Sequence, residues 1–162
     1  MAISRRKRGR YFQRLPEAPT PIGVQVIRRV SFSDVDPMGI LWHGRYPKYF
    51  ELAYEELGRN CGITYSDFMR ERLCAPIVQF HVDYFEPLYL EEEAAITARM
   101  VWCDGARLNI EYEIGKEKGE LGASGYTVQM FIDQSNEPLM VTPPLIERCR
   151  SSWAQGEFSH LQ

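Results

Sequence analysis

One long amphipathic segment constrains the fold of this 162-residue chain more than any other feature. Between residues 46 and 57, apolar side chains recur at intervals of three and four and form one continuous helical face. These side chains are Tyr46, Tyr49, Phe50, Ala53, Tyr54 and Leu57. Pro47 is compatible with a helix that begins near His43 or Gly44, because first-turn N–H groups have no intrahelical acceptor to lose. Gly62 is predicted to end the helix.

Segments with the two-residue period of β-strands lie on both sides of this helix. The first runs from Ile22 to Phe32, and four more follow residue 75. The later predicted strands are 77–85, 94–103, 107–115 and 125–133. Asp104-Gly105 is a favoured hairpin turn between two of them. The sequence therefore predicts an α+β fold, in which a strand and a long helix precede an antiparallel meander of about four strands.

Two short helices complete the predicted order. One lies in the segment TYSDFMRER, with Thr64 or Ser66 as its cap, and the other opens at Pro143 and Pro144 and continues to Ala154. A composition of 44% hydrophobic and 25% charged residues matches one ordinary domain. We place that domain at residues 21–155, after a basic and flexible arm at 1–20 and before a tail at 156–162.

The arm carries six basic side chains and one acidic side chain, Glu17. Basic arms can bind nucleic acid, but no nucleic-acid fold signature follows this one, so we expect no nucleic-acid partner. No apolar run approaches the ~20 residues of a membrane-spanning helix. The basic start also lacks the apolar stretch of a secretory signal, so we expect no membrane insertion and a cytoplasmic location.

The four cysteines predict neither a metal site nor a catalytic thiol. They are Cys61, Cys74, Cys103 and Cys149. They form no C-x-x-C pair and have no histidine at zinc-ligand spacing. We therefore expect no metal ligands in the chain and interpret the cysteines as buried or idle thiols.

The segment DVDPMGILWHGRYPKYFELA, which begins at residue 34, carries the most specific pattern in the sequence. It resembles an element of hotdog-fold acyl-CoA thioesterases of the 4-hydroxybenzoyl-CoA thioesterase type, D-x-D-x-x-G-x-x-x-H-x-x-Y-x-x-x-F-E. The matching residues are Asp34, Asp36, Gly39, His43, Tyr46, Phe50 and Glu51. The histidine is similar to that of the Tol-Pal-associated branch. Weaker likenesses in VDYFEPLYLEE and GELGASGYTVQMFID extend the resemblance over about residues 22–150.

The resemblance implies a hotdog fold, a curved antiparallel sheet wrapped around one long central helix. It also implies a homodimer or homotetramer with active sites at the subunit interface. The implied activity is hydrolysis of an acyl-CoA or acyl-carrier-protein thioester to a free carboxylic acid. No cofactor is implied, because CoA is part of the substrate.

The same resemblance assigns roles within this segment. Asp36 matches the catalytic carboxylate, as nucleophile or as general base for water, and His43 is the second catalytic candidate. N–H groups near His43 would polarise the thioester carbonyl. Gly39, Trp42 and Tyr46 are the candidate substrate-binding residues. Taken singly, Asp34, Tyr46 and Glu51 favour ordinary structural roles.

Two other functions stay open at this point. A hotdog hydratase or dehydratase would also use an aspartate and a histidine, although the spacing from Asp36 to His43 departs from the D-x-x-x-x-H pattern of those enzymes. A non-catalytic module that binds acyl thioesters is the other alternative, since a fold does not fix a function.

Overall fold

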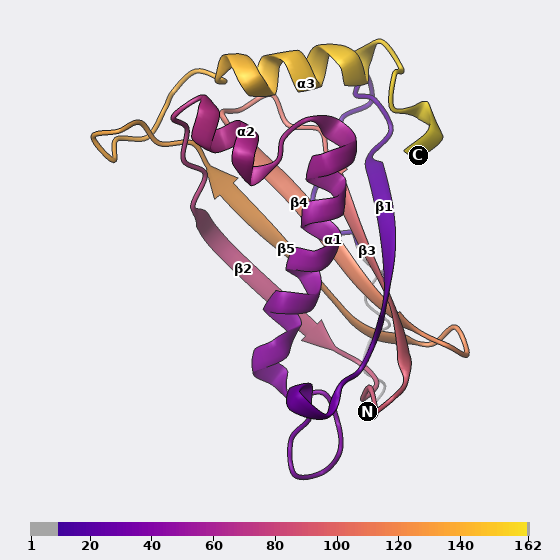
Figure 1. Cartoon of the computed structure of the whole chain (residues 1–162). Coiled ribbons are helices and arrows are strands. Elements are labelled where there is room, and N and C mark those ends of the chain that lie inside the picture. Colours follow the sequence, from indigo (N-terminus) through magenta and orange to yellow (C-terminus); the bar gives the residue numbers. More distant parts are fainter. Residues whose placement is uncertain (1–9, 162) are drawn as a thin grey trace, which may run out of the picture.

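The computed structural model describes residues 10–161. Residues 1–9 of the predicted basic arm and residue 162 of the predicted tail lie outside the described residues. The chain forms one antiparallel sheet of five strands with a long helix against one face (Figure 1). This is the predicted α+β hotdog arrangement.

The long helix α1 spans Tyr46–Cys61 and follows a 3₁₀ turn at His43–Arg45. Pro47 lies in its first turn, and Gly62 caps it with a φ of 68°. All six side chains of the predicted apolar face are buried. The helix prediction is therefore confirmed, because the local period and the tertiary packing select the same face.

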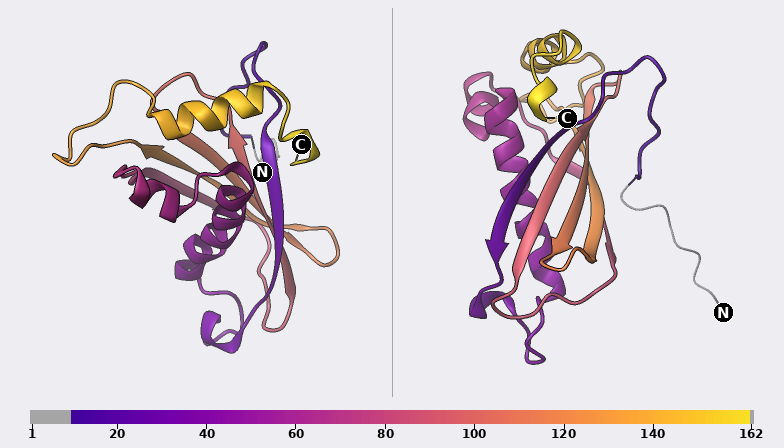
Figure 2. Two further views of the ribbon diagram at one scale, coloured as in Figure 1. Left: turned by 45° about the horizontal axis from the view of Figure 1, so that its top comes forward. Right: turned by 90° about the vertical axis from the view of Figure 1, so that its right-hand side faces the viewer.

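The sheet consists of five strands in the order β1-β3-β4-β5-β2, and every neighbouring pair is antiparallel. The strands are β1 Ile22–Arg29, β2 Ile77–Tyr84, β3 Glu93–Val101, β4 Arg107–Lys116 and β5 Leu121–Met130. Helix α1 packs mainly on β1 and β3. Figure 2 shows the sheet curving around the helix.

The predicted meander of about four consecutive strands is wrong in one respect. Strand β2 does not pair with β3 but lies at the far edge of the sheet, next to β5. The connection after β2 runs back across the sheet because Leu88 is fully buried and its carbonyl accepts a 2.7 Å hydrogen bond from the Leu41 N–H. Only β3, β4 and β5 form a true meander.

The ends of two strands also differ from the sequence prediction. Strand β1 ends at Arg29, and Phe32 lies in a 3₁₀ turn with 83% of its side chain exposed. Strand β5 begins at Leu121, four residues earlier than predicted. Alternation alone did not fix either boundary, since the turn after β1 continues the alternation, while Gly122, Ala123 and Ser124 at the start of β5 lack it.

The short helices lie where the sequence predicts them. Helix α2 spans Tyr65–Arg70 with Thr64 as its cap, and α3 spans Pro144–Ala154. A final 3₁₀ turn at Ser159–Leu161 brings Leu161 against the core. Within residues 10–161, no helix combines the length and the apolar character needed to span a bilayer.

The described part of the N-terminal arm lies on the face of the sheet opposite α1 (Figure 2). There Tyr11, Phe12 and Arg14 form hydrogen bonds with side chains of the sheet. Residues 11–14 are thus packed against the sheet, which differs from the flexible arm that the sequence predicts for 1–20. The physical reason is the buried carboxylate of Glu111 on β4, which accepts hydrogen bonds from the arm.

Candidate active site

A tight hairpin joins β1 to α1 and carries Asp36. The Asp36 N–H donates to the Ile40 carbonyl and the Gly39 N–H donates to the Asp36 carbonyl, both at 2.9 Å. Pro37 suits the second position of such a turn, and Gly39 has a φ of 75°, where other residues are strained. Gly39 is therefore required by the turn itself.

The Asp36 side chain is half-buried beside this turn. Its Oδ1 accepts a 2.8 Å hydrogen bond from the Met38 N–H, which fixes the carboxylate relative to the turn. Among the described residues, no group donates to Oδ2. One oxygen thus holds the side chain in place, while the other is available to a substrate or a water molecule.

Asp34 has a different environment although it lies only two residues away. It is 3% exposed, and its Oδ2 accepts hydrogen bonds from the Ser31 hydroxyl at 2.8 Å and the Tyr49 hydroxyl at 3.2 Å. The Arg45 guanidinium lies 3.7 Å from Oδ1. Burial, followed by the Asp34 charge, raises the pKa of Tyr49 to about 12. Asp34 therefore anchors the hairpin to the start of α1.

The other end of the hairpin leads into the N-terminus of α1. The Trp42 N–H donates to the Asp34 carbonyl, and the Trp42 carbonyl accepts from the Arg45 N–H at 2.8 Å. Within the described residues, the N–H groups of His43 and Gly44 donate to no acceptor. Unpaired N–H groups at a helix start attract an oxygen with negative charge, and the helix dipole adds to that attraction.

Aromatic side chains surround these N–H groups. The Trp42 ring lies so close to Gly44 that a Cβ added to Gly44 would be 2.4 Å from a ring carbon. The centroid of the Trp42 ring is 5.1 Å from the centroid of the exposed His43 ring. Tyr84 of β2 donates from its hydroxyl to the His43 carbonyl at 3.4 Å. Its ring meets the Tyr46 ring edge-on, with 4.8 Å between centroids.

The five predicted site residues thus lie on one continuous segment but occupy different positions along it. Asp36 and Gly39 form the turn of the hairpin, and Trp42 and His43 lie at its other end. Tyr46 is 4% exposed and packs in the core behind Tyr84. No hydrogen bond or ion pair joins Asp36 to His43 among the described residues.

Tyr84 contacts the candidate site, although the sequence analysis assigned it no role. It lies in the segment VDYFEPLYLEE, and the weak likeness of this segment to the thioesterases was the one signal in the sequence that pointed to it. Its distance from His43 in sequence hides the contact, because β2 and the hairpin meet only in the folded chain. The contact makes β2 part of the site.

Strand β2 also exposes apolar side chains along an edge that pairs with no strand of the described chain. The large apolar residues exposed on β2 and directly after it are Ile77, Val78, Phe80, Tyr84, Phe85, Tyr89 and Leu90. Unpaired apolar edges are a liability in a monomer and typically mark an interface. The candidate site therefore adjoins a surface suited to a partner.

The cysteines are not placed for catalysis. Cys61 and Cys149 are 5% and 6% exposed, and their mutual hydrogen bond, together with burial, raises the pKa of the Cys61 thiol. Cys74 and Cys103 are free thiols away from the hairpin. Within residues 10–161, no group of three or more His, Cys, Asp or Glu side chains is arranged to hold a metal ion.

Residues 30–148 match the Thioesterase-like superfamily, a span that includes the hairpin, α1 and all of the sheet except β1. The chain belongs to this superfamily. A putative acyl-CoA thioesterase, YneP, of Bacillus subtilis is 25% identical over 66% of this chain and 78% of its own length. The acyl-CoA thioester hydrolase YbgC of Escherichia coli is 24% identical over 71% of this chain and 83% of its own length.

Solved structures share the fold of this superfamily member. A DHNA-CoA thioesterase from Staphylococcus aureus matches with a TM-score of 0.71 and 24% identity, over 86% of this chain and 93% of its own. A second S. aureus protein, solved in complex with CoA, matches with a TM-score of 0.73 and 15% identity, over 85% and 86% of the two chains. At these identities the likeness supports the hotdog fold.

Proposed function

We propose that this thioesterase-family protein hydrolyses acyl-CoA thioesters at the hairpin that joins β1 to α1. The observation that carries the proposal is the pairing of a partly free carboxylate, Asp36, with the unbonded N–H groups of His43 and Gly44 at the start of α1. The first supplies a nucleophile or base, and the second binds the oxygen that gains charge in the transition state.

Two balanced routes are available to Asp36. As a nucleophile, its carboxylate attacks the carbonyl carbon, forms a mixed anhydride and expels CoA as a thiolate, and water then cleaves the anhydride. As a general base, it takes a proton from water while the resulting hydroxide attacks and the thiolate leaves. In both routes the His43 and Gly44 N–H groups stabilise the oxyanion, and the His43 ring orients substrate or carboxylate.

We also propose that a second copy of the chain completes the site. The exposed apolar residues of β2 adjoin Tyr84, which itself contacts His43, so pairing of two β2 edges buries this surface beside the site. Neither Asp36 nor His43 lines any of four cavities found in the described part of the chain. A homodimer, or a homotetramer built from it, supplies the missing wall.

The aromatic surroundings favour a flat or apolar acyl group. Trp42 and Tyr84 present ring surfaces near the proposed oxyanion-binding N–H groups, and the buried Tyr46 ring packs behind Tyr84. Relatives of the fold include thioesterases named for 1,4-dihydroxy-2-naphthoyl-CoA and gentisyl-CoA. No metal or redox cofactor enters either route, and CoA takes part only as the leaving group.

A panel of acyl-CoA thioesters tests the proposal, with release of free CoA followed by a thiol-reactive dye. We expect turnover by the wild-type protein and its loss in Asp36→Asn. An acyl-carrier-protein thioester of the same acyl chain serves as the competing substrate class. Tight binding of acyl-CoA without any thiol release would instead support the non-catalytic module, and consumption of an enoyl-CoA without thiol release would support a hydratase.

A further inference from the structure

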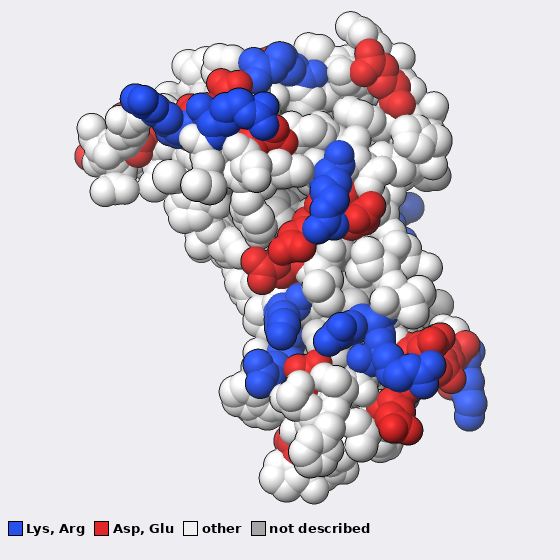
Figure 3. All heavy atoms as spheres, in the orientation of Figure 1, with Lys and Arg blue, Asp and Glu red and all other residues white. Residues whose placement is uncertain are grey.

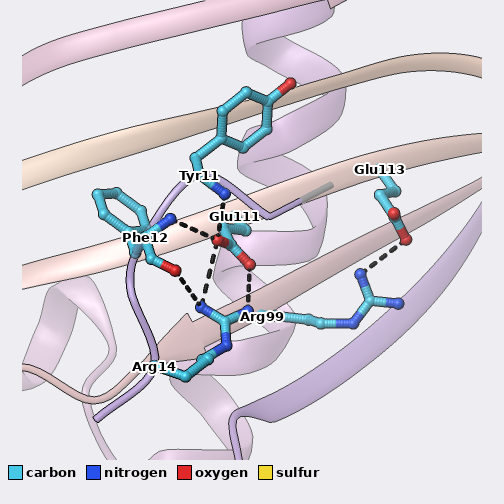
Figure 4. A network of polar contacts seen from close by, with 6 residues as sticks. All are labelled: Tyr11, Phe12, Arg14, Arg99, Glu111 and Glu113. Carbon is cyan, nitrogen blue, oxygen red and sulfur yellow. Dashed lines mark hydrogen bonds and ion pairs between the residues drawn. The ribbon is translucent and has the colours of Figure 1, made fainter. Parts of the chain in front are cut away.

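The carboxylate of Glu111 lies at the centre of the outer face of the sheet and is fully buried. Its Oε1 accepts hydrogen bonds from the backbone N–H groups of Tyr11 at 2.7 Å and Phe12 at 2.9 Å, and Arg14 pairs with its Oε2 at 2.5 Å (Figure 4). The neighbouring Arg99 pairs with Glu113 instead. Among the described residues, every hydrogen-bond and ion-pair partner of the Glu111 carboxylate therefore belongs to the arm.

This arrangement fixes residues 11–14, which we call the arm clasp, on the sheet. A buried carboxylate is costly unless it is paired and hydrogen-bonded. The clasp supplies one cation and two N–H groups, so Glu111 and the clasp stabilise each other. The opposite charges also explain why basic Arg14 lies over this part of the sheet.

Tyr11 extends the clasp from β4 to the edge strand β2. Its hydroxyl donates to Asp83 Oδ2 at 2.9 Å and also meets the Ser124 hydroxyl of β5. Its ring packs against Tyr126, with 5.1 Å between centroids, and contacts His81 edge-on. Burial raises the pKa of Tyr11 to about 12, so at neutral pH the hydroxyl keeps the proton that it donates.

The opposite face of the same strand end contacts the candidate active site. Successive side chains of a strand point to opposite faces, so Asp83 meets the clasp while Tyr84 faces α1. Tyr84 contacts the Tyr46 ring and the His43 carbonyl, next to the proposed oxyanion-binding N–H groups. Because β2 pairs with β5 alone among the described strands, these contacts hold its end from both faces.

We propose that the arm clasp is a positioning element for the active site, in which the Tyr11 hydroxyl fixes the end of β2 and thereby sets Tyr84 against the His43–Gly44 segment. This inference rests on the proposed function of that segment. It makes Tyr11 a positioning residue on the far side of the sheet from the substrate. Displacements of about 1 Å at a catalytic site can cost ~10²-fold in rate, so small shifts of β2 are expected to matter.

The test compares Tyr11→Phe with Phe12→Leu in the full-length protein. The first variant removes only the hydroxyl that reaches Asp83 and keeps the ring. The second weakens a ring contact of the clasp with Tyr126 of β5 and keeps the Tyr11 hydroxyl that reaches Asp83. We expect Tyr11→Phe to lower kcat by about 3- to 10-fold with KM within about twofold, because the lost alignment acts on the transition state. Phe12→Leu should keep kcat near the wild-type value.

Hydrogen exchange supplies a readout that does not need activity. Amides of residues 77–85 should exchange faster in Tyr11→Phe than in the wild type and Phe12→Leu. Unchanged exchange would overturn the inference, and faster exchange with an unchanged kcat would reduce the clasp to a structural role and overturn it equally. If the wild-type protein hydrolyses no thioester, the proposed function fails, and the exchange comparison alone then decides whether the clasp holds β2.

Discussion

Replacing Arg14 by alanine tests how strongly the buried Glu111 charge depends on the arm. Loss of one partner of a buried ion pair typically costs about 3–5 kcal/mol. Two features of this site reduce that figure. The Tyr11 and Phe12 N–H groups still bind the carboxylate at 2.7 and 2.9 Å, and the Arg14 side chain is 29% exposed, so water can take its place. We therefore expect a loss of about 2–3 kcal/mol in the free energy of unfolding.

Thermal and urea unfolding measure this loss. For a domain of this size, 1 kcal/mol corresponds to roughly 2–4 °C in Tm, so Arg14→Ala should lower Tm by about 4–12 °C. All variants are compared at one protein concentration, because dimerisation makes Tm depend on concentration. Arg29→Ala is the matched control. Arg29 pairs with Glu93 at 3.0 Å, but the two side chains are 63% and 48% exposed, and such pairs contribute about 0–1 kcal/mol.

The reasoning is refuted if Arg14→Ala unfolds at the same temperature as Arg29→Ala. A double variant, Arg14→Ala with Glu111→Leu, separates loss of the charge pair from loss of packing. Removal of both charges leaves no unpaired carboxylate, so this variant should recover part of the stability that Arg14→Ala loses. A double variant less stable than both single variants would contradict the assignment of the loss to the buried charge.

Three further predictions separate the functional residues from the structural ones. Asp36→Asn should lower kcat by at least about 100-fold and leave Tm nearly unchanged. Asp34→Asn should instead lower Tm, because the buried Asp34 carboxylate anchors Ser31 and Tyr49. Parallel assays of turnover and unfolding check both variants. Gly39→Ala should cost about 1–2 kcal/mol in urea unfolding, because the turn requires a φ of 75°. Deletion of residues 1–20, which removes the contacts of Tyr11, Phe12 and Arg14 with Glu111, should lower Tm, and calorimetry at matched concentration measures the loss.

The sequence predicts the elements whose signals are local. The face of α1 repeats every three to four residues, its end has a glycine at position 62, and Thr64 caps α2. In each case the local preference and the tertiary packing agree. The order of the strands has no comparable signal, because pairing of β2 with β5 joins residues far apart in the chain. Consecutive strands were therefore predicted to be neighbours, which is correct only from β3 to β5.

The candidate site was predictable as a segment but not as a geometry. The motif located Asp34 and Asp36 together, and its resemblance assigned the catalytic role to Asp36. Only the structure shows that Asp34 is buried while Asp36 is half-buried with one carboxylate oxygen unbonded among the described residues. Glu51 lies exposed on α1, as its sequence position favours. The contact of Tyr84 with His43 depends on where β2 lies, and that position is a property of the whole sheet.

The arm clasp shows why an alternating sequence pattern does not by itself predict which side chains of a strand are buried. In β4, Asn109, Glu111 and Glu113 alternate with apolar residues, which predicts that they share a solvent-facing side of the sheet. They do share one face, but Asn109 and Glu111 are only 4% and 0% exposed, and the arm covers Glu111. Alternation reports which residues share a face and not whether another segment lies on it. The arm supplies the partners that the buried Glu111 charge needs, the Arg14 guanidinium and the N–H groups of Tyr11 and Phe12. The neutral Asn109 Oδ1 is buried without a hydrogen-bond partner among the described residues, so the arm pairs the charged group of this face first.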